Sequence, residues 1–252
     1  MARSNFLAIL IALVAGAAQA QAVKPNVTPP KPALPAVPPC RPQSLVSMTV
    51  RDVTPGLQAV DQRAQPRRMW RQGSRFLRSV EQPAVSASLQ DPKEPMTRQA
   101  LVIIAEPDLW MIDLASGAGG HAVDKDPVLE VRAPVLPVGA PAEFMALEFG
   151  CETEFVAARA AVAQKTLRWG AVEAAIHTYV VGTHSLAILM DDRTGEPFMI
   201  TYVRDDRPAY VVRYDEYRRG LPDQPELFRP SPDVTIREIP SKPPGKPTES
   251  GR

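Results

Sequence analysis

Four closely spaced apolar runs near the C-terminal end constrain the fold more than any other part of this sequence. The separators between them contain Gly, Asp and Pro, residues that favour the backbone angles of tight turns. Strands joined by loops this short pair as an antiparallel meander. The four predicted strands are residues 166–181, 185–190, 197–204 and 209–214.

The first half of the chain contains further apolar runs of β-type composition. One of them, residues 67–80, predicts either one long strand or a hairpin that turns near Gly73. The glycine cluster at 117–120 predicts a flexible turn. The other predicted strands are residues 44–53, 100–105, 109–114 and 128–132.

Helices are predicted to be few and short. Residues 141–149 start with Pro and are followed by Gly150, the usual asymmetry of a helix. Residues 54–61 are a weaker candidate. The sequence therefore predicts an α+β fold that is mainly an antiparallel sheet, with one to three short helices packed on one face.

The N-terminal 20 residues have the pattern of a cleavable export signal. Arg3 precedes an apolar stretch from Phe6 to Ala18, and Ala18-Gln19-Ala20 is an A-x-A site with cleavage expected after Ala20. A membrane anchor is the alternative, but these 13 apolar residues are fewer than the roughly 20 that a spanning helix needs. We expect a periplasmic or secreted protein that does not span the membrane after processing.

Proline-rich segments border the predicted domain at both ends. Eight prolines between Pro25 and Pro42 predict an extended spacer, and residues 240–252 predict a disordered tail. The expected organisation is therefore a signal peptide at 1–20, a spacer at 21–40, a single β-rich domain at 41–239 and a tail.

The charge balance argues against a general nucleic-acid binder. Loss of Arg3 with the signal peptide reduces the 29 basic residues to 28, which equals the number of acidic residues. Proteins that bind nucleic acid usually carry a strongly basic surface.

Cys40 and Cys151 are the two cysteines of the chain. In an oxidising compartment the simplest prediction is that they form one disulfide. A catalytic or metal-binding thiol is the alternative, but neither cysteine has another Cys or a His at ligand spacing.

No catalytic constellation is recognisable in the sequence, so we predict neither an enzyme nor a cofactor. The chain lacks a Gly-x-Ser-x-Gly elbow, a phosphate loop and a His-Glu-x-x-His helix. His177 and His184 flank a predicted hairpin turn, but no cluster of Cys or carboxylate residues completes a metal shell beside them. We predict no metal site.

Six arginines lie within the sixteen residues from Arg63 to Arg78. With the two-residue period of a strand, Arg67, Arg71 and Arg75 project from one face while Trp70 and Phe76 project from the other. The arginine face is either an ordinary solvated surface or a docking surface for an acidic partner or lipid head groups.

The predicted strands are also rich in large apolar side chains. Such side chains are first of all core, but one face of a curved sheet with few covering helices could remain partly open as a site for an apolar molecule. The candidate ligand-binding residues are Trp70, Phe76, Trp110, Ile112, Ile176 and Leu189.

The C-terminal third resembles the periplasmic lipoprotein-carrier (LolA-like) superfamily over roughly residues 165–239. The matching pieces are DDRTGEP (191–197), a strand at 198–203, VVRYD (211–215), Leu221-Pro222 and LFRP (227–230). The resemblance implies an incomplete β-barrel, or half-barrel, with short helices on its concave side, and a lipid or lipoprotein ligand. The proline-rich entry and the two cysteines depart from the family pattern, and no cargo-contacting residue of the carriers maps onto a position here.

Two functions follow from these observations. The first is an exported envelope protein that holds a lipid, an acyl chain or a lipoprotein in an apolar hollow. The alternative is a non-catalytic interaction or scaffold protein of the envelope, which docks through the arginine strand and the proline-rich stalk.

Overall fold

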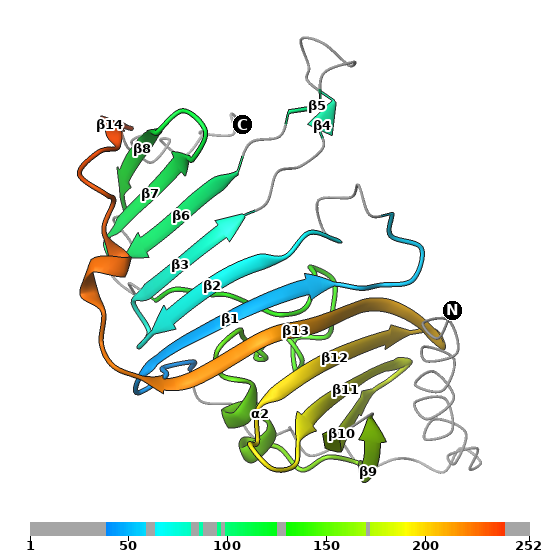
Figure 1. Ribbon diagram of the computed structural model, residues 1–252. Helices are drawn as coiled ribbons and strands as arrows, with labels where there is room; N and C mark the ends of the chain where they lie inside the picture. The colour runs from blue at the N-terminus through cyan, green and yellow to red at the C-terminus, as the bar shows by residue number, and fades with distance from the viewer. Residues whose placement is uncertain are drawn as a thin grey trace, which may run out of the picture.

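The computed structural model describes residues 39–58, 64–81, 86–87, 95–96, 99–124, 130–169 and 172–239. The predicted signal peptide, nearly all of the spacer and the C-terminal tail lie outside the described residues. Twelve strands form one curved, open and mostly antiparallel sheet (Figure 1). The sheet and its few short helices confirm the predicted α+β class.

The strands of the first half of the chain are β1 (Leu45–Asp52), β2 (Arg67–Gln72), β3 (Phe76–Glu81), β6 (Ala100–Ala105), β7 (Asp108–Asp113) and β8 (Ala118–Val123). Those of the second half are β9 (Ala163–Trp169), β10 (Val172–Val181), β11 (His184–Asp191), β12 (Pro197–Arg204), β13 (Arg207–Leu221) and β14 (Thr235–Glu238). The separate pair is β4 (Ser86–Ala87) and β5 (Pro95–Met96). Within the described residues the helices are the α-helix α2 (Glu152–Ala158) and the 3₁₀-helix η3 (Pro225–Phe228).

The large sheet consists of two meanders joined at its centre. The strand order is β14-β8-β7-β6-β3-β2-β1-β13-β12-β11-β10-β9. The central pair is β1 and β13, in which Leu45 lies opposite Leu221. After β13 the chain returns to the far edge, where β14 pairs in parallel with β8.

The strand predictions are largely confirmed. Strands β6 and β12 have the predicted bounds, and residues 67–80 form the hairpin β2–β3 around Gly73, whose φ is 56°. The predicted strand at 166–181 is wrong in one respect, because it is two strands, β9 and β10, paired from Trp169–Val172 onwards. The predicted strand at 128–132 is absent from its described part, residues 130–132.

The predicted helix at 141–149 is wrong. Its backbone forms a succession of turns, such as the hydrogen bond from Phe144 N to Pro141 O, and the α-helix starts only after Cys151. The candidate helix at 54–61 contains a turn at 55–56, and its end lies outside the described residues.

The glycine cluster at 117–120 is a turn only at its start. Gly119 and Gly120 lie within β8, between β7 and β14. A Cβ on Gly119 would lie 2.7 Å from the carbonyl oxygen of Met111, so the close pairing of β8 with β7 requires glycine there.

The main core lies on one face of the sheet, which we call the core face. Residues 130–151, here called the crossing segment, and the following helix α2 pack across this face (Figure 1). The side chains of the crossing segment and α2 that join the core include Val131, Val135, Leu136, Phe144, Leu147, Phe149 and Phe155. They meet β-strand residues such as Val46, Met48, Met69, Leu186, Ile188, Ile200, Tyr202 and Val212.

Two smaller clusters lie on the opposite face. In the first meander, Leu101, Ile103 and Ile112 pack against Phe228 of η3, which the returning chain carries across β3 and β6. In the second meander, Leu189 packs with its own group of strand residues. On this face η3 therefore covers the first meander, whereas the buried residues of the second cluster all belong to strands.

Candidate functional site

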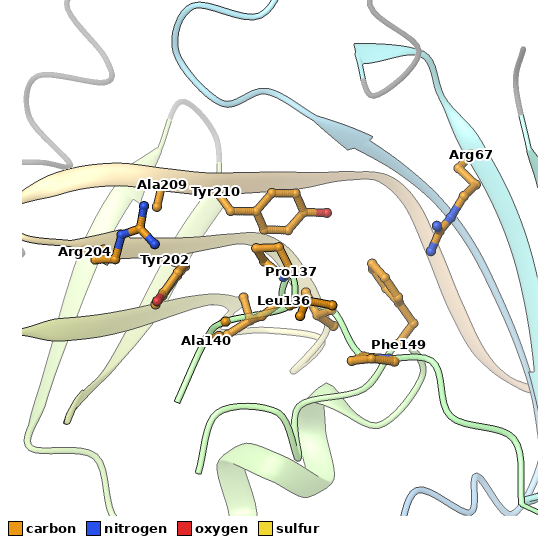
Figure 2. Close-up of a pocket in the computed structure, with 13 residues that line it drawn as sticks. Arg67, Leu136, Pro137, Ala140, Phe149, Tyr202, Arg204, Ala209 and Tyr210 are labelled. Atoms are coloured by element: carbon orange, nitrogen blue, oxygen red, sulfur yellow. The ribbon is translucent and has the colours of Figure 1, made fainter. Parts of the chain in front are cut away.

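A cavity of about 430 Å³ opens between the crossing segment and the ends of β12 and β13 (Figure 2). Its volume falls within the range of about 300–1,000 Å³ that is usual for small-molecule sites. The lining residues are Arg67, residues 134–140, Phe149, Tyr202, Arg204, Ala209 and Tyr210.

The crossing segment forms the apolar wall of the cavity. It folds back on itself, with hydrogen bonds from Val135 N to Leu147 O and from Phe149 N to Ala133 O. The turn at 137–140 contains Gly139 with a φ of 97°, a left-handed conformation that favours glycine. At its tip Val138 is fully exposed, so an apolar side chain stands in solvent beside the cavity.

The opposite wall comes from the hairpin β12–β13. Tyr202 lies directly across from Tyr210, but Val203 lies across from Pro208, so Ala209 is an extra residue on β13. Such bulges bend a strand and redirect its side chains. Here the bulge brings Ala209 and both tyrosines into the cavity lining.

Tyr202 is held in place from two sides. Its hydroxyl is 2.7 Å from Nδ1 of His184, whose ring stacks on it at 5.9 Å, and Phe144 packs edge-on at 6.5 Å. Burial raises the pKa of Tyr202, and the charge of Arg204 opposes this change. The hydroxyl of Tyr202 is therefore a neutral hydrogen-bonding group at physiological pH.

Two arginines and no acidic residue line the cavity among the described residues. The guanidinium of Arg67 lies 5.1 Å from the centre of the Phe149 ring, and its Nε is 3.7 Å from Oε1 of Glu81. Arg204 is exposed and forms no ion pair with any residue that the structure describes. The lining of the cavity therefore combines apolar residues with two arginines.

A buried network fastens the cavity wall to the sheet. The guanidinium of Arg71 donates to Oε2 of Glu148 at 2.9 Å and to the carbonyl oxygens of Val131 and Phe149 at 2.8 and 3.2 Å. Gly150, which follows the carbonyl of Phe149, adopts a φ of 88°, a left-handed conformation that favours glycine. The side chain of Arg71 thereby holds both ends of the folded-back crossing segment.

The end of the crossing segment is fixed by a disulfide and a buried carboxylate. Cys40 and Cys151 form the predicted disulfide, which confirms that expectation. Next to it Glu152 accepts hydrogen bonds from the hydroxyls of Tyr214 and Tyr217 at 2.6 and 3.0 Å, and from Gly150 N. Burial raises the pKa of Glu152, and these hydrogen bonds partly oppose the rise.

The three predicted docking arginines have different environments. Arg67 lines the cavity, and Arg75 is exposed in the β2–β3 turn, where it donates to the carbonyl oxygen of Glu106 at 2.6 Å. Arg71 is only 1% exposed. The expectation that Arg71 contributes to a docking surface is therefore wrong, because the crossing segment covers this face of β2.

The six predicted ligand-binding residues do not line one site. Trp70, Trp110 and Ile112 belong to the cluster around Phe228, and the ring of Phe76 lies 5.2 Å from that of Phe228. The remaining two, Ile176 and Leu189, lie in the separate cluster of the second meander. All six lie on the face opposite to the cavity.

Arg204, Tyr210 and the turn at 137–140 are not among the site residues predicted from the sequence. The signal that could have found the first two is the Asp205-Asp206 turn, which folds β12 and β13 together. The bulge at Ala209 changes the register, however, so the pairing of Tyr202 with Tyr210 does not follow from turn length alone.

The described residues contain no group of three or more His, Cys, Asp or Glu side chains placed to hold a metal ion. In the same part of the chain, no helix has the length and apolar character needed to cross a membrane. His177 lies opposite Ile188 in the sheet, whereas His184 contacts Tyr202.

The sequence matches no protein-family model and none of the curated proteins. Among solved structures, an uncharacterised conserved protein from Thermus thermophilus has 9% identity and a TM-score of 0.41, covering 78% of this chain and 91% of its own. MucB in complex with MucA(peri) has 8% identity and a TM-score of 0.40, covering 78% of this chain and 58% of its own. A LolA superfamily protein from Nitrosomonas europaea has 10% identity and a TM-score of 0.22, covering 75% and 90%. The solved structures similar to this chain thus include a LolA superfamily protein, at low identity and a low TM-score.

Proposed function

We propose that this chain is an exported binding protein of the cell envelope that holds a lipid, an acyl chain or the acyl part of a lipoprotein on the core face of its sheet. The observation that carries this proposal is the cavity of about 430 Å³ between the crossing segment and the β12–β13 hairpin. The exposed Val138 at its edge adds apolar surface where a chain would enter.

The binding energy would come mainly from removing an apolar chain from water. Each buried methylene contributes about 0.8 kcal/mol, so a chain that buries about eight of them gains roughly 6 kcal/mol before the cost of association. The exposed Pro137 and Val138 would supply contacts, and the fastening network of Arg71 would keep the wall in place.

Two features support an extracytoplasmic location. The disulfide between Cys40 and Cys151 is of the kind that persists in oxidising compartments. The N-terminal 20 residues have the pattern of an export signal. We infer that the protein acts in the periplasm or after secretion, without catalysing a reaction.

Docking through the arginine strand is less well supported. Burial of Arg71 leaves Arg75 as the one exposed member of the predicted trio outside the cavity. The proline-rich stalk lies outside the described residues, so it adds no evidence for this alternative.

The proposal is tested with the full chain, expressed with its own N-terminal segment and purified from the periplasmic fraction. We expect native mass spectrometry to detect a co-purified lipid, and a fluorescent fatty-acid probe to bind the delipidated protein. Replacing Ala209 with Trp fills the cavity and should weaken probe binding at least tenfold. Ala115→Trp, in the exposed turn between β7 and β8, is the matched control.

Two results would contradict the proposal. One is an empty preparation that also fails to bind the probe. The other is equal probe affinity of Ala209→Trp and the wild-type chain, which would place any binding outside the cavity.

A further inference from the structure

We propose that the cavity selects an amphiphile with an anionic head group, a carboxylate or a phosphate, through the positive charge of Arg67 and Arg204 on its two sides. The inference rests on the proposed function, since it specifies the ligand of the same cavity. It adds the charge of the ligand, which the apolar residues of the lining do not specify.

The charge of the lining favours an anion. Arg67 and Arg204 are the charged residues among the side chains that form the cavity, and no described lining residue is acidic. Figure 2 shows the two arginines on opposite sides, with Tyr210 and Phe149 between them. Positive charge on two sides of a cavity concentrates anions there.

Neither guanidinium is committed to a strong partner. Arg204 has no ion pair among the described residues. The pair of Arg67 with Glu81 is long, 3.7 Å, and both side chains are about one-third exposed. Arg67 also donates to Sδ of Met69 at 3.2 and 3.1 Å and lies over the ring of Phe149. Thioether acceptors and exposed ion pairs are weak partners, so an anionic ligand can compete with them for Arg67.

The backbone holds Arg204 at the cavity. This residue lies at the end of β12, directly opposite Arg207 and His184 in the two flanking strands. The two-residue turn that follows holds Asp205 and Asp206 at φ values of 51° and 59°, which closes the hairpin tightly. The backbone of Arg204 is thus fixed beside the cavity while its side chain stays exposed.

The rest of the lining suits an apolar chain. Between the arginines the wall consists of Pro, Val, Leu, Gly and Ala residues at 134–140. Their side chains have no polar group that would bind a free inorganic anion. The aromatic side chains of Tyr202 and Tyr210 complete the lining. An amphiphile can place its anionic group near an arginine and its apolar chain against this wall.

The experiment compares ligands that share a twelve-carbon chain. The full exported chain, delipidated, is loaded with N-phenyl-1-naphthylamine, a neutral fluorescent probe, which is then displaced by dodecanoate, dodecyl phosphate, dodecanol or inorganic phosphate. A charge-assisted hydrogen bond should make dodecanoate and dodecyl phosphate about tenfold or more tighter than dodecanol. Inorganic phosphate should not displace the probe.

Charge-removing variants assign the effect to the arginines. Arg204→Gln and Arg67→Gln should each reduce the preference for anions over dodecanol, and the double variant should abolish it. Arg218→Gln is the matched control, because this exposed arginine lies on the opposite face of the sheet. Arg204→Gln keeps the test decisive even if Arg67→Gln disturbs the packing on Phe149.

The outcomes separate the two proposals. Equal affinities for dodecanoate and dodecanol would overturn the anionic head group while leaving a binding protein for apolar chains. Displacement by inorganic phosphate as effective as by dodecyl phosphate would show a free-anion site and overturn the amphiphile. Failure of every twelve-carbon ligand to displace the probe would overturn the proposed function itself.

Discussion

Replacement of Arg71 by Met tests whether the crossing segment depends on one buried arginine of β2. The guanidinium of Arg71 pairs with Glu148 and donates to backbone carbonyls of the crossing segment. Met has a side chain of comparable length without charge, so the change removes these interactions with little loss of volume. The prediction concerns the free energy of unfolding.

The magnitude follows from the partners left behind. Removing one member of a buried ion pair costs about 3–5 kcal/mol, because the other charge stays buried. Glu148 retains Arg132 at 2.6 Å, which favours the lower end, whereas the carbonyls that lose their donor cost about 1 kcal/mol each. We expect a loss of about 3–5 kcal/mol, equivalent to about 6–20 °C in melting temperature for a domain of this size.

Urea unfolding followed by tryptophan fluorescence measures this loss. The matched control is Arg75→Met, because Arg75 is exposed in the adjacent turn and its removal should change stability by less than about 0.5 kcal/mol. A double-mutant cycle with Glu148→Gln should give a coupling energy of about 1 kcal/mol or more. Equal effects of the two arginine replacements, or no coupling to Glu148, would refute the assignment of Arg71 to the fastening network.

Three further predictions concern other parts of the fold. Replacing both cysteines with Ser should lower stability by about 2–5 kcal/mol and make it insensitive to reductant; a variant as stable as the oxidised protein would contradict this. The pKa of His121 is raised, chiefly by its hydrogen bond to Glu238. The protonated ring therefore stabilises the docking of β14. This contribution is complete below about pH 6.5 and is lost as the pH rises through the raised pKa. Amide exchange of β14, corrected for intrinsic rates, should therefore accelerate from pH 6 to pH 9 in the wild type and not in His121→Gln. Gly119→Ala should cost about 1–3 kcal/mol in thermal unfolding because its Cβ meets backbone, whereas Gly120→Ala meets only the side-chain end of Ile239; equal costs would argue against the tight β7–β8 pairing.

The strands were predictable because their signals are local. Alternation and turn residues predicted the bounds of β6 and β12 correctly, and Gly73 marks the β2–β3 turn. The same alternation placed Arg71 and Trp70 on opposite faces of β2, as the register with β3 confirms. Alternation does not show which face is covered, so it could not distinguish a core arginine from a surface one.

The cavity was not predictable because its parts come from distant segments. The wall at 134–140 has no regular periodicity, and the turns that follow it share the Pro and Gly boundaries of a helix. The opposite wall depends on a bulge at Ala209 that no single residue type announces. The contact between these two walls is a property of the tertiary packing and not of either segment.

The pairing of β1 with β13 also determines when the two halves of the sheet can join during synthesis. Each meander contains contacts between neighbouring strands, which can form early. The central pair instead joins the two ends of the domain, as in the hydrogen bond from Gly220 N to Ser44 Oγ across 176 residues. A chain that is synthesised from its N-terminus must therefore hold two half-sheets with unpaired inner edges until β13 appears, and these edges are the sites at which a delayed chain would meet a chaperone or aggregate.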